Sequence, residues 1–121
     1  MFTGDSPIFQ QLAAKIADDI VAGTYPEESA VPSATDFALF FQMNPATASK
    51  GVNTLVDRGV LYKKRGIGMF VATGARELLL SHRRDLFAEQ FVHPLLREAS
   101  ALHITTAEIH TMLDKLDGVA S

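Results

Sequence analysis

Residues 33–58 read SATDFALFFQMNPATASKGVNTLVDR, a stretch that carries the start signals of two short helices. Ser33, followed three residues later by Asp36, has the spacing of a capping box, with aspartate in place of the usual glutamate. Asn44 is a favoured N-cap, and the proline after it occupies the first helical position, where no N–H is needed. The connector between the helices is short and lacks the glycine that is frequent in such turns. The stretch therefore predicts two helices joined by a tight turn.

The second of these helices has two chemically different faces. Its apolar positions recur at i, i+4, i+7 and i+8 from Ala48 to Val56, the pattern of a helix with one buried stripe. The opposite face is small, polar and singly basic, so it can lie in a groove and hydrogen-bond base edges and phosphates. Gly59 is expected to end the helix in the left-handed conformation. These features predict a DNA-reading helix, while periodicity alone leaves a helical hairpin with another role as the alternative.

A β-hairpin is expected directly after this helix. Residues 60–65 and 69–72 are β-prone runs that flank a Gly-Ile-Gly turn. Three consecutive cations, Lys63, Lys64 and Arg65, lead into that turn, where the glycines carry no side chain to hold the backbone away from a polyanion. The pattern predicts a basic wing beside the helices. The alternative is a solvated edge hairpin whose lysines discourage aggregation.

An N-terminal helix is expected to support this pair of helices. Ser6-Pro7 forms a cap-then-proline start, and apolar residues follow at i+4 spacing, which predicts a helix over residues 7–22. Its apolar stripe would complete a three-helix core. Residues 30–32 are expected to form a short extended piece that pairs with the wing. Glu27 and Glu28, in the intervening loop, are expected to lie away from the basic residues.

Three blocks of the chain resemble the winged helix-turn-helix domain of GntR-family bacterial transcriptional regulators: SPIFQQLAAKIADDIVAGTY, then VPSATDFALFFQMNPATASKGVNTLVDRGVL, then KRGIGMFV. Asn44-Pro45, where most of the family has Ser-Arg, and the short C-terminal tail resemble the YtrA-like subfamily. The resemblance implies regulation of transcription, most often repression. Thr35 and Ser49 stand where the family usually has arginines, so the resemblance does not carry the family's sequence preference to this chain.

The predicted DNA-contacting residues come from the helix-turn-helix and the wing. Ala46, Lys50 and Asn53 belong to the outward face of the second helix, and Lys63 and Lys64 belong to the basic run. The resemblance assigns DNA contact to most of the others. The full set is Ser33, Asn44, Ala46, Thr47, Ser49, Lys50, Asn53, Lys63, Lys64, Arg65, Gly66 and Gly68.

The composition changes after residue 73, which predicts a boundary there. The expected parts are a winged helix-turn-helix DNA-binding domain over residues 1–73 and a C-terminal helical dimerisation region over residues 74–121. Pro94 is expected to kink or split the first tail helix, and a capping box is expected to start the last one, which Gly118 would end. A region of fewer than fifty residues cannot enclose a sizeable core alone. Its apolar faces therefore predict a two-fold homodimer. The alternative is that these helices fold back onto the winged domain. The predicted interface residues are Leu79, Leu80, Leu86, Phe87, Phe91, Leu95, Ile109, Met112, Leu113 and Leu116.

Length and composition limit the classes of protein to which the chain can belong. A chain of 121 residues that is 47% hydrophobic can form one core with a helical appendage. It has no cysteine, which excludes disulfides and thiolate zinc sites and fits a reducing cytoplasm. The net charge of −3 is unusual for a nucleic-acid binder, but most cations of the first 73 residues fall on the proposed reader helix and wing. No apolar run approaches the roughly 20 residues of a membrane span.

These patterns predict a sequence-specific DNA-binding regulator, with double-stranded DNA and a second copy of the chain as partners. A dimer would place two reader helices in successive major grooves, roughly 34 Å apart, on an inverted-repeat operator. A small-molecule effector would have to bind between helices or at the dimer seam. No catalytic site is predicted, because the sequence has no cysteine, no serine elbow and no paired carboxylates next to a histidine. No cofactor is predicted. No metal site is predicted either, because histidines scattered over amphipathic helices are more often surface or interface residues; these are His82, His93, His103 and His110. The alternative is a winged-helix adaptor that binds only proteins.

Overall fold

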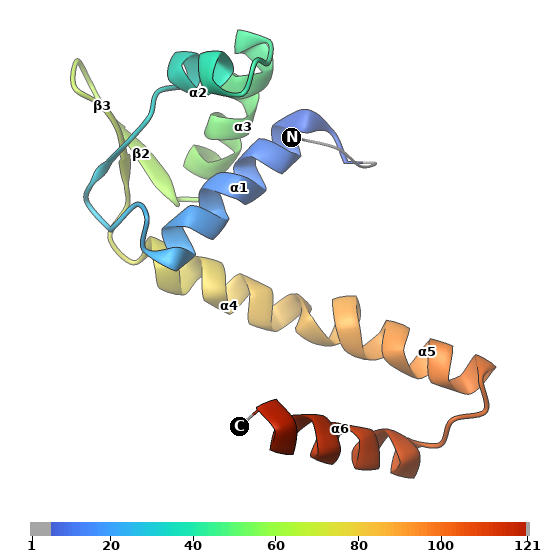
Figure 1. Ribbon diagram of the computed structural model, residues 1–121. Coiled ribbons are helices and arrows are strands. Elements are labelled where there is room, and N and C mark those ends of the chain that lie inside the picture. The colour runs from blue at the N-terminus through green and yellow to red at the C-terminus, as the bar shows by residue number, and fades with distance from the viewer. Residues whose placement is uncertain (1–5, 121) are drawn as a thin grey trace. The chain divides into compact units, whose positions relative to one another are not determined.

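The computed structural model describes residues 6–120, with side chains described through Gly118 (Figure 1). The chain is mainly helical with one small antiparallel sheet, which confirms the predicted fold class. It forms two compact units, of which the first ends at His82 and the second begins at Arg83. The functional boundary after residue 73 stays a prediction.

The first unit is a winged helix-turn-helix. Its sheet has the order β1-β3-β2 with both pairs antiparallel, so the predicted short extended piece does pair with the wing. Figure 1 shows the β2–β3 hairpin on one flank of the helices. The elements up to His82 are α1 (Ile8–Ala22), β1 (Ala30–Val31), α2 (Ala34–Phe40), α3 (Pro45–Asp57), β2 (Leu61–Lys64), β3 (Gly68–Val71) and the start of α4 (Ala75–Phe87).

The core of this unit forms where α1 crosses α3. Leu12 and Ile16 of α1 and Leu55 of α3 are fully buried, as the apolar spacing of both helices predicted. The crossing is close because Gly51 has no side chain: a Cβ there would lie 2.8 Å from the carbonyl oxygen of Phe9. The close approach at Gly51 therefore sets the distance between α3 and α1.

The helix starts in the helix-turn-helix follow the predicted caps. Ser33 Oγ accepts the Asp36 N–H at 3.1 Å, and the Asp36 carboxylate accepts the Ser33 N–H at 3.2 Å. Asn44 Oδ1 accepts the Ala46 N–H at 2.8 Å. In the connector Gln42 has φ +53°, so a non-glycine residue takes the left-handed position. Gly59 follows α3 with φ +78°, as expected.

Three local predictions need correction. Pro7, not Ser6, is the N-cap of α1, and the Ser6 carbonyl accepts a hydrogen bond from the Gln11 amide at 2.7 Å. The hairpin register places Lys64 opposite Gly68, so Gly68 begins β3 instead of closing the turn. Gly118 lies inside α6 (Thr106–Ala120), because glycine weakens a helix without having to end it.

The second unit contains helices with little buried surface. After α4 the chain passes through a π-helical segment, Ala88–Val92, into α5 (His93–Ala101), and α6 follows. The break comes where Pro94 was expected to cause it, since proline has no N–H to continue the α-helical ladder. Thr105 and Glu108 form the predicted capping box. Ala99 and Ile109 are the buried apolar residues in the described part of this unit.

Candidate nucleic-acid interface

Helix α3 presents its polar face outward. Ala48, Val52 and Leu55 are buried. Ala46, Ser49, Lys50 and Asn53 share the opposite side by their i+3 and i+4 spacing, and Asn44 and Thr47 lie at the N-terminal end of the helix. None of the predicted DNA-contacting residues is buried: Thr47, Ser49 and Lys64 are half-buried, and the others are exposed.

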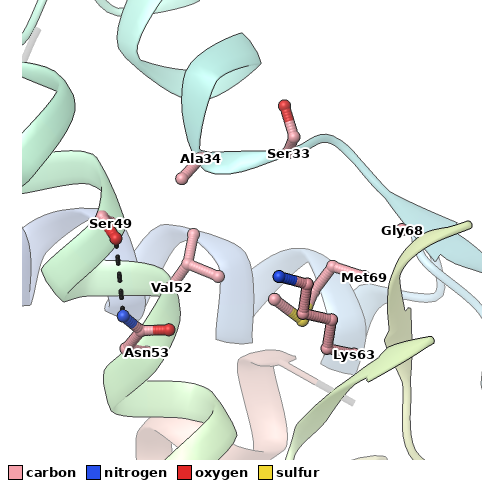
Figure 2. A pocket seen from close by; sticks show the side chains of 8 residues that line it. All are labelled: Ser33, Ala34, Ser49, Val52, Asn53, Lys63, Gly68 and Met69. Carbon is pink, nitrogen blue, oxygen red and sulfur yellow. Dashed lines mark hydrogen bonds between the residues drawn. The ribbon is translucent and has the colours of Figure 1, made fainter. Parts of the chain in front are cut away.

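A hollow of about 310 Å³ lies where the start of α2, the outer side of α3 and the wing meet. It contains predicted site residues from all three elements. Figure 2 shows the Lys63 side chain reaching from the wing toward α3, where Asn53 Nδ2 donates to Ser49 Oγ at 3.4 Å. The lining residues are Ser33, Ala34, Ser49, Val52, Asn53, Lys63, Gly68 and Met69.

Some lining residues were missed by the sequence-based predictions. Met69 lies directly opposite Lys63 in the β2–β3 register, so a correct register would have identified it. Ala34 follows the cap residue Ser33 at the start of α2. Val52 was assigned only to the core stripe, although its side chain also reaches the edge of the hollow.

The basic run of the wing is divided between two faces of the sheet. Successive side chains of a strand point to opposite faces, so Lys63 lies on the same face as buried Leu61, toward the helices. The Lys64 ammonium instead lies over the outer-face rings, 4.2 Å from the centroid of Phe70 and 5.8 Å from that of Tyr62. The expectation that the neighbouring lysines form one basic surface is therefore corrected.

Two other predicted cations lie apart from the hollow. Arg65 and Gly66 are exposed in the hairpin turn, next to Ile67, whose side chain is 73% exposed. The Lys50 ammonium lies 4.1 Å from the ring centroid of Phe9, on the side of α3 that faces α1. The outward face of α3 thus has the hollow along one edge and Lys50 along the other.

The outer face of the wing carries a carboxylate that was expected to lie away from the basic residues. Hydrogen bonds from the Thr73 and Tyr62 hydroxyls hold the pKa of the Glu28 carboxyl below its ordinary value, and nearby Lys64 acts in the same direction. The hydrogen bond to Glu28 raises the pKa of Tyr62, because the phenol must keep its proton to donate it. Glu28 therefore offsets part of the positive charge of Lys64 on this face.

The predicted interface residues are buried, half-buried or exposed. Leu79 belongs to the core of the first unit, where it is 2% exposed, and Ile109 is buried within the second unit. Leu80 and Leu86 are half-buried. The exposed members are Phe87, Phe91, Leu95, Met112, Leu113 and Leu116. The exposed group remains available to a second copy of the chain.

Residues 6–120 contain neither a metal-binding cluster nor a membrane-spanning helix. No three acidic or histidine side chains converge there in a way that could hold a metal ion. None of the helices in the described chain is both long and apolar enough to span a bilayer.

Comparison with known proteins places the chain in a family. No family model matches it. A solved structure described as a transcriptional regulator of the GntR family from Bacteroides thetaiotaomicron is 35% identical, covers 94% of this chain and 99% of its own, and superposes with a TM-score of 0.78. The chain belongs to the GntR family.

Two further relatives of this GntR-family chain bear on the site. The transcriptional repressor YtrA of Bacillus subtilis is 22% identical over 92% of this chain and 85% of its own length, which is consistent with the YtrA-like resemblance. The DNA-binding domain of AraR, solved in complex with an operator, is 27% identical over 60% of this chain and 93% of its own, with a TM-score of 0.56. The chain spans 35% and 36% of the length of two other curated relatives.

Proposed function

We propose that this GntR-family chain is a DNA-binding transcriptional regulator that acts as a homodimer on an inverted-repeat operator, as a repressor. The operator complex of the AraR domain, which matches 60% of this chain, supports duplex DNA as the partner. The match to the repressor YtrA over most of both chains supports the direction of regulation.

The observation that carries the proposal is that Ser33, Ser49, Asn53 and Lys63, which come from three different segments, line one hollow. Hydroxyl, amide and ammonium groups are the groups with which proteins bind phosphates and base edges. The side chains of α3 are short enough to let the helix enter a major groove.

The capping bonds decide which hydrogen-bonding groups remain free for DNA. Ser33 Oγ accepts the Asp36 N–H, so its hydroxyl proton stays available. Asn44 uses Oδ1 to accept the Ala46 N–H, so its amide N–H groups remain donors. Lys63 adds an ammonium group, so the donors of this surface include a hydroxyl, an amide and an ammonium. Such a surface suits phosphate oxygens and the acceptor atoms of purine edges.

Homodimer formation is proposed from the second unit. Its large apolar side chains are exposed, among them Phe87 at 57% and Phe91 at 61%, and their rings lie 5.4 Å apart. Exposed apolar clusters of this kind mark association surfaces. A two-fold pair would present two copies of α3 to one duplex. A small-molecule effector would act on this regulator by changing its operator affinity.

Selection of bound fragments from the host genome, followed by a mass measurement of the complex, tests the proposal. The expected result is a recurring inverted repeat with two protein chains on each duplex. Replacing Asn53 by alanine should then change the preference among sites by about 1–3 kcal/mol if Asn53 contacts a base edge. Equal losses on selected and random DNA would make Asn53 a positioning residue, and failure to enrich any fragment would contradict DNA binding.

A further inference from the structure

The loop between α1 and β1 holds a non-glycine residue in a backbone conformation that glycine normally takes. Glu28 has φ +66°. Its N–H donates to the Val71 carbonyl at 2.8 Å, and the Val71 N–H donates to the Ser29 carbonyl at 3.0 Å, so the loop is tied to the end of β3. Strained residues of this kind persist where surrounding contacts fix them, and such positions often serve function.

The Glu28 side chain joins the wing to the segment that precedes α4. Its Oε1 accepts the Tyr62 hydroxyl and its Oε2 accepts the Thr73 hydroxyl, each at 2.5 Å. Tyr62 belongs to β2, whereas Thr73 lies between β3 and α4. One carboxylate therefore bridges two segments that could otherwise move separately.

The neighbouring carboxylate binds the start of α4 itself. Glu27 Oε1 accepts the Gly74 N–H at 2.9 Å, and Oε2 accepts the Arg76 N–H at 3.2 Å, which satisfies two backbone donors at a helix N-terminus. Arg76 Nε in turn donates to the carbonyl of Val21 in α1 at 2.9 Å. The first turn of α4 is thus bound to the loop and to α1.

We infer that Glu27 and Glu28 are positioning residues that fix the direction in which α4 leaves the reader unit, and so set the half-site spacing that a dimer can bind. The inference rests on the proposed homodimer. Gly74, at φ +82°, directly precedes α4, and the two carboxylates bind the chain on both sides of it, at Thr73 and at Arg76. Because an α-helix rises about 1.5 Å per residue, a small change of direction at its start displaces its far end by an amount that grows with its length, so a loosened start would blur the spacing.

The test uses full-length protein with the Glu28→Gly and Glu27→Gln variants. Glycine adopts the left-handed conformation without strain, so Glu28→Gly removes the carboxylate while relieving the backbone and should remain folded. Tyr62→Phe deletes one donor to Glu28. Tyr25→Phe is its matched control, because the ring of Tyr25 lines a separate hollow with Phe37 and Phe41.

Affinity is measured on three duplexes: a single half-site, the selected inverted repeat, and the repeat with one or two base pairs inserted. Wild-type protein should prefer the natural spacing by about 100-fold, since paired binding is lost when the geometry forbids it. In Glu28→Gly and Glu27→Gln this preference should fall to about tenfold or less, with single-half-site affinity within about twofold of wild type. Tyr62→Phe should give a smaller loss, and Tyr25→Phe none.

Unchanged spacing preference in both glutamate variants would overturn the inference. A loss of affinity for the single half-site as large as the loss for the inverted repeat would also overturn it, as would loss of folding in both variants. In either case the loop would only stabilise the unit. Wild-type protein that binds no duplex, or shows no preference for paired half-sites, would instead contradict the proposed function.

Discussion

The two units of this chain differ in how far they bury their large apolar side chains. In the first unit α1, α3 and the sheet enclose fully buried side chains such as Leu12, Ile16 and Leu55. In the described part of the second unit, large apolar residues such as Phe91 and Leu116 are exposed. The first unit therefore encloses a buried core of its own, whereas the C-terminal helices leave large apolar side chains exposed to a further surface.

A leucine-to-alanine substitution in each unit should give effects of different kinds, and the one in the first unit should cause the greatest loss of stability. Leu55→Ala removes a side chain that is 0% exposed and should lower the free energy of unfolding by about 2–5 kcal/mol at any protein concentration. Leu116, at 66% exposure, should matter only in the dimer, so Leu116→Ala should lower the thermal midpoint mainly by weakening association. Denaturant and thermal unfolding over a range of protein concentrations separate the two cases. A Leu116→Ala effect that is independent of concentration would contradict the comparison.

Glycine-to-alanine changes sharpen the same contrast, with effects of opposite sign. In Gly51→Ala the new Cβ would lie 2.8 Å from the Phe9 backbone oxygen, so the substitution should destabilise the first unit by about 1–3 kcal/mol. Gly118→Ala meets nothing within 4 Å in α6 and should stabilise that helix by roughly 0.5–1 kcal/mol. Circular dichroism during urea titration measures both. Stabilisation by Gly51→Ala would show that α1 and α3 are not in close contact.

The smallest effect expected is a change with pH in the first unit. The pKa of Glu28 is lowered in the folded protein, so its contribution to stability is present above the ordinary carboxyl pKa and is lost as pH falls through the folded value. Thermal midpoints of wild type and Glu28→Gln, measured from neutral to acidic pH, should therefore converge as the pH falls. A difference that stays constant with pH would show that the carboxylate charge has no part in these bonds.

Local signals in the sequence predicted the elements of the reader unit well. The capping box at Ser33, the cap at Asn44 and the left-handed Gly59 are all present, because each depends on residues within a few positions. Three consecutive cations predict a single basic surface, but strand alternation places Lys63 and Lys64 on opposite faces of the sheet.

The contacts of the α1–β1 loop were beyond local prediction. Glu27 meets Gly74 across 47 positions in the chain, and Glu28 meets Tyr62 across 34. Such pairings form only once the core has placed α1 and the sheet together. Nothing in the neighbouring residues signals that Glu28 adopts a left-handed conformation, since a glutamate is not expected there.

The salt dependence of DNA binding in Lys63→Ala and Lys64→Ala tests whether the hollow beside α3 contacts DNA. The two lysines are adjacent in β2, but Lys63 lines the hollow beside α3 and Lys64 lies over Phe70 on the outer face. If the hollow binds phosphate, Lys63→Ala should reduce the slope of log affinity against log salt concentration by about 0.9, while Lys64→Ala should leave it near the wild-type value. Equal slopes in both variants would contradict the assigned interface, and a wild-type protein without salt dependence would favour an adaptor that binds only proteins.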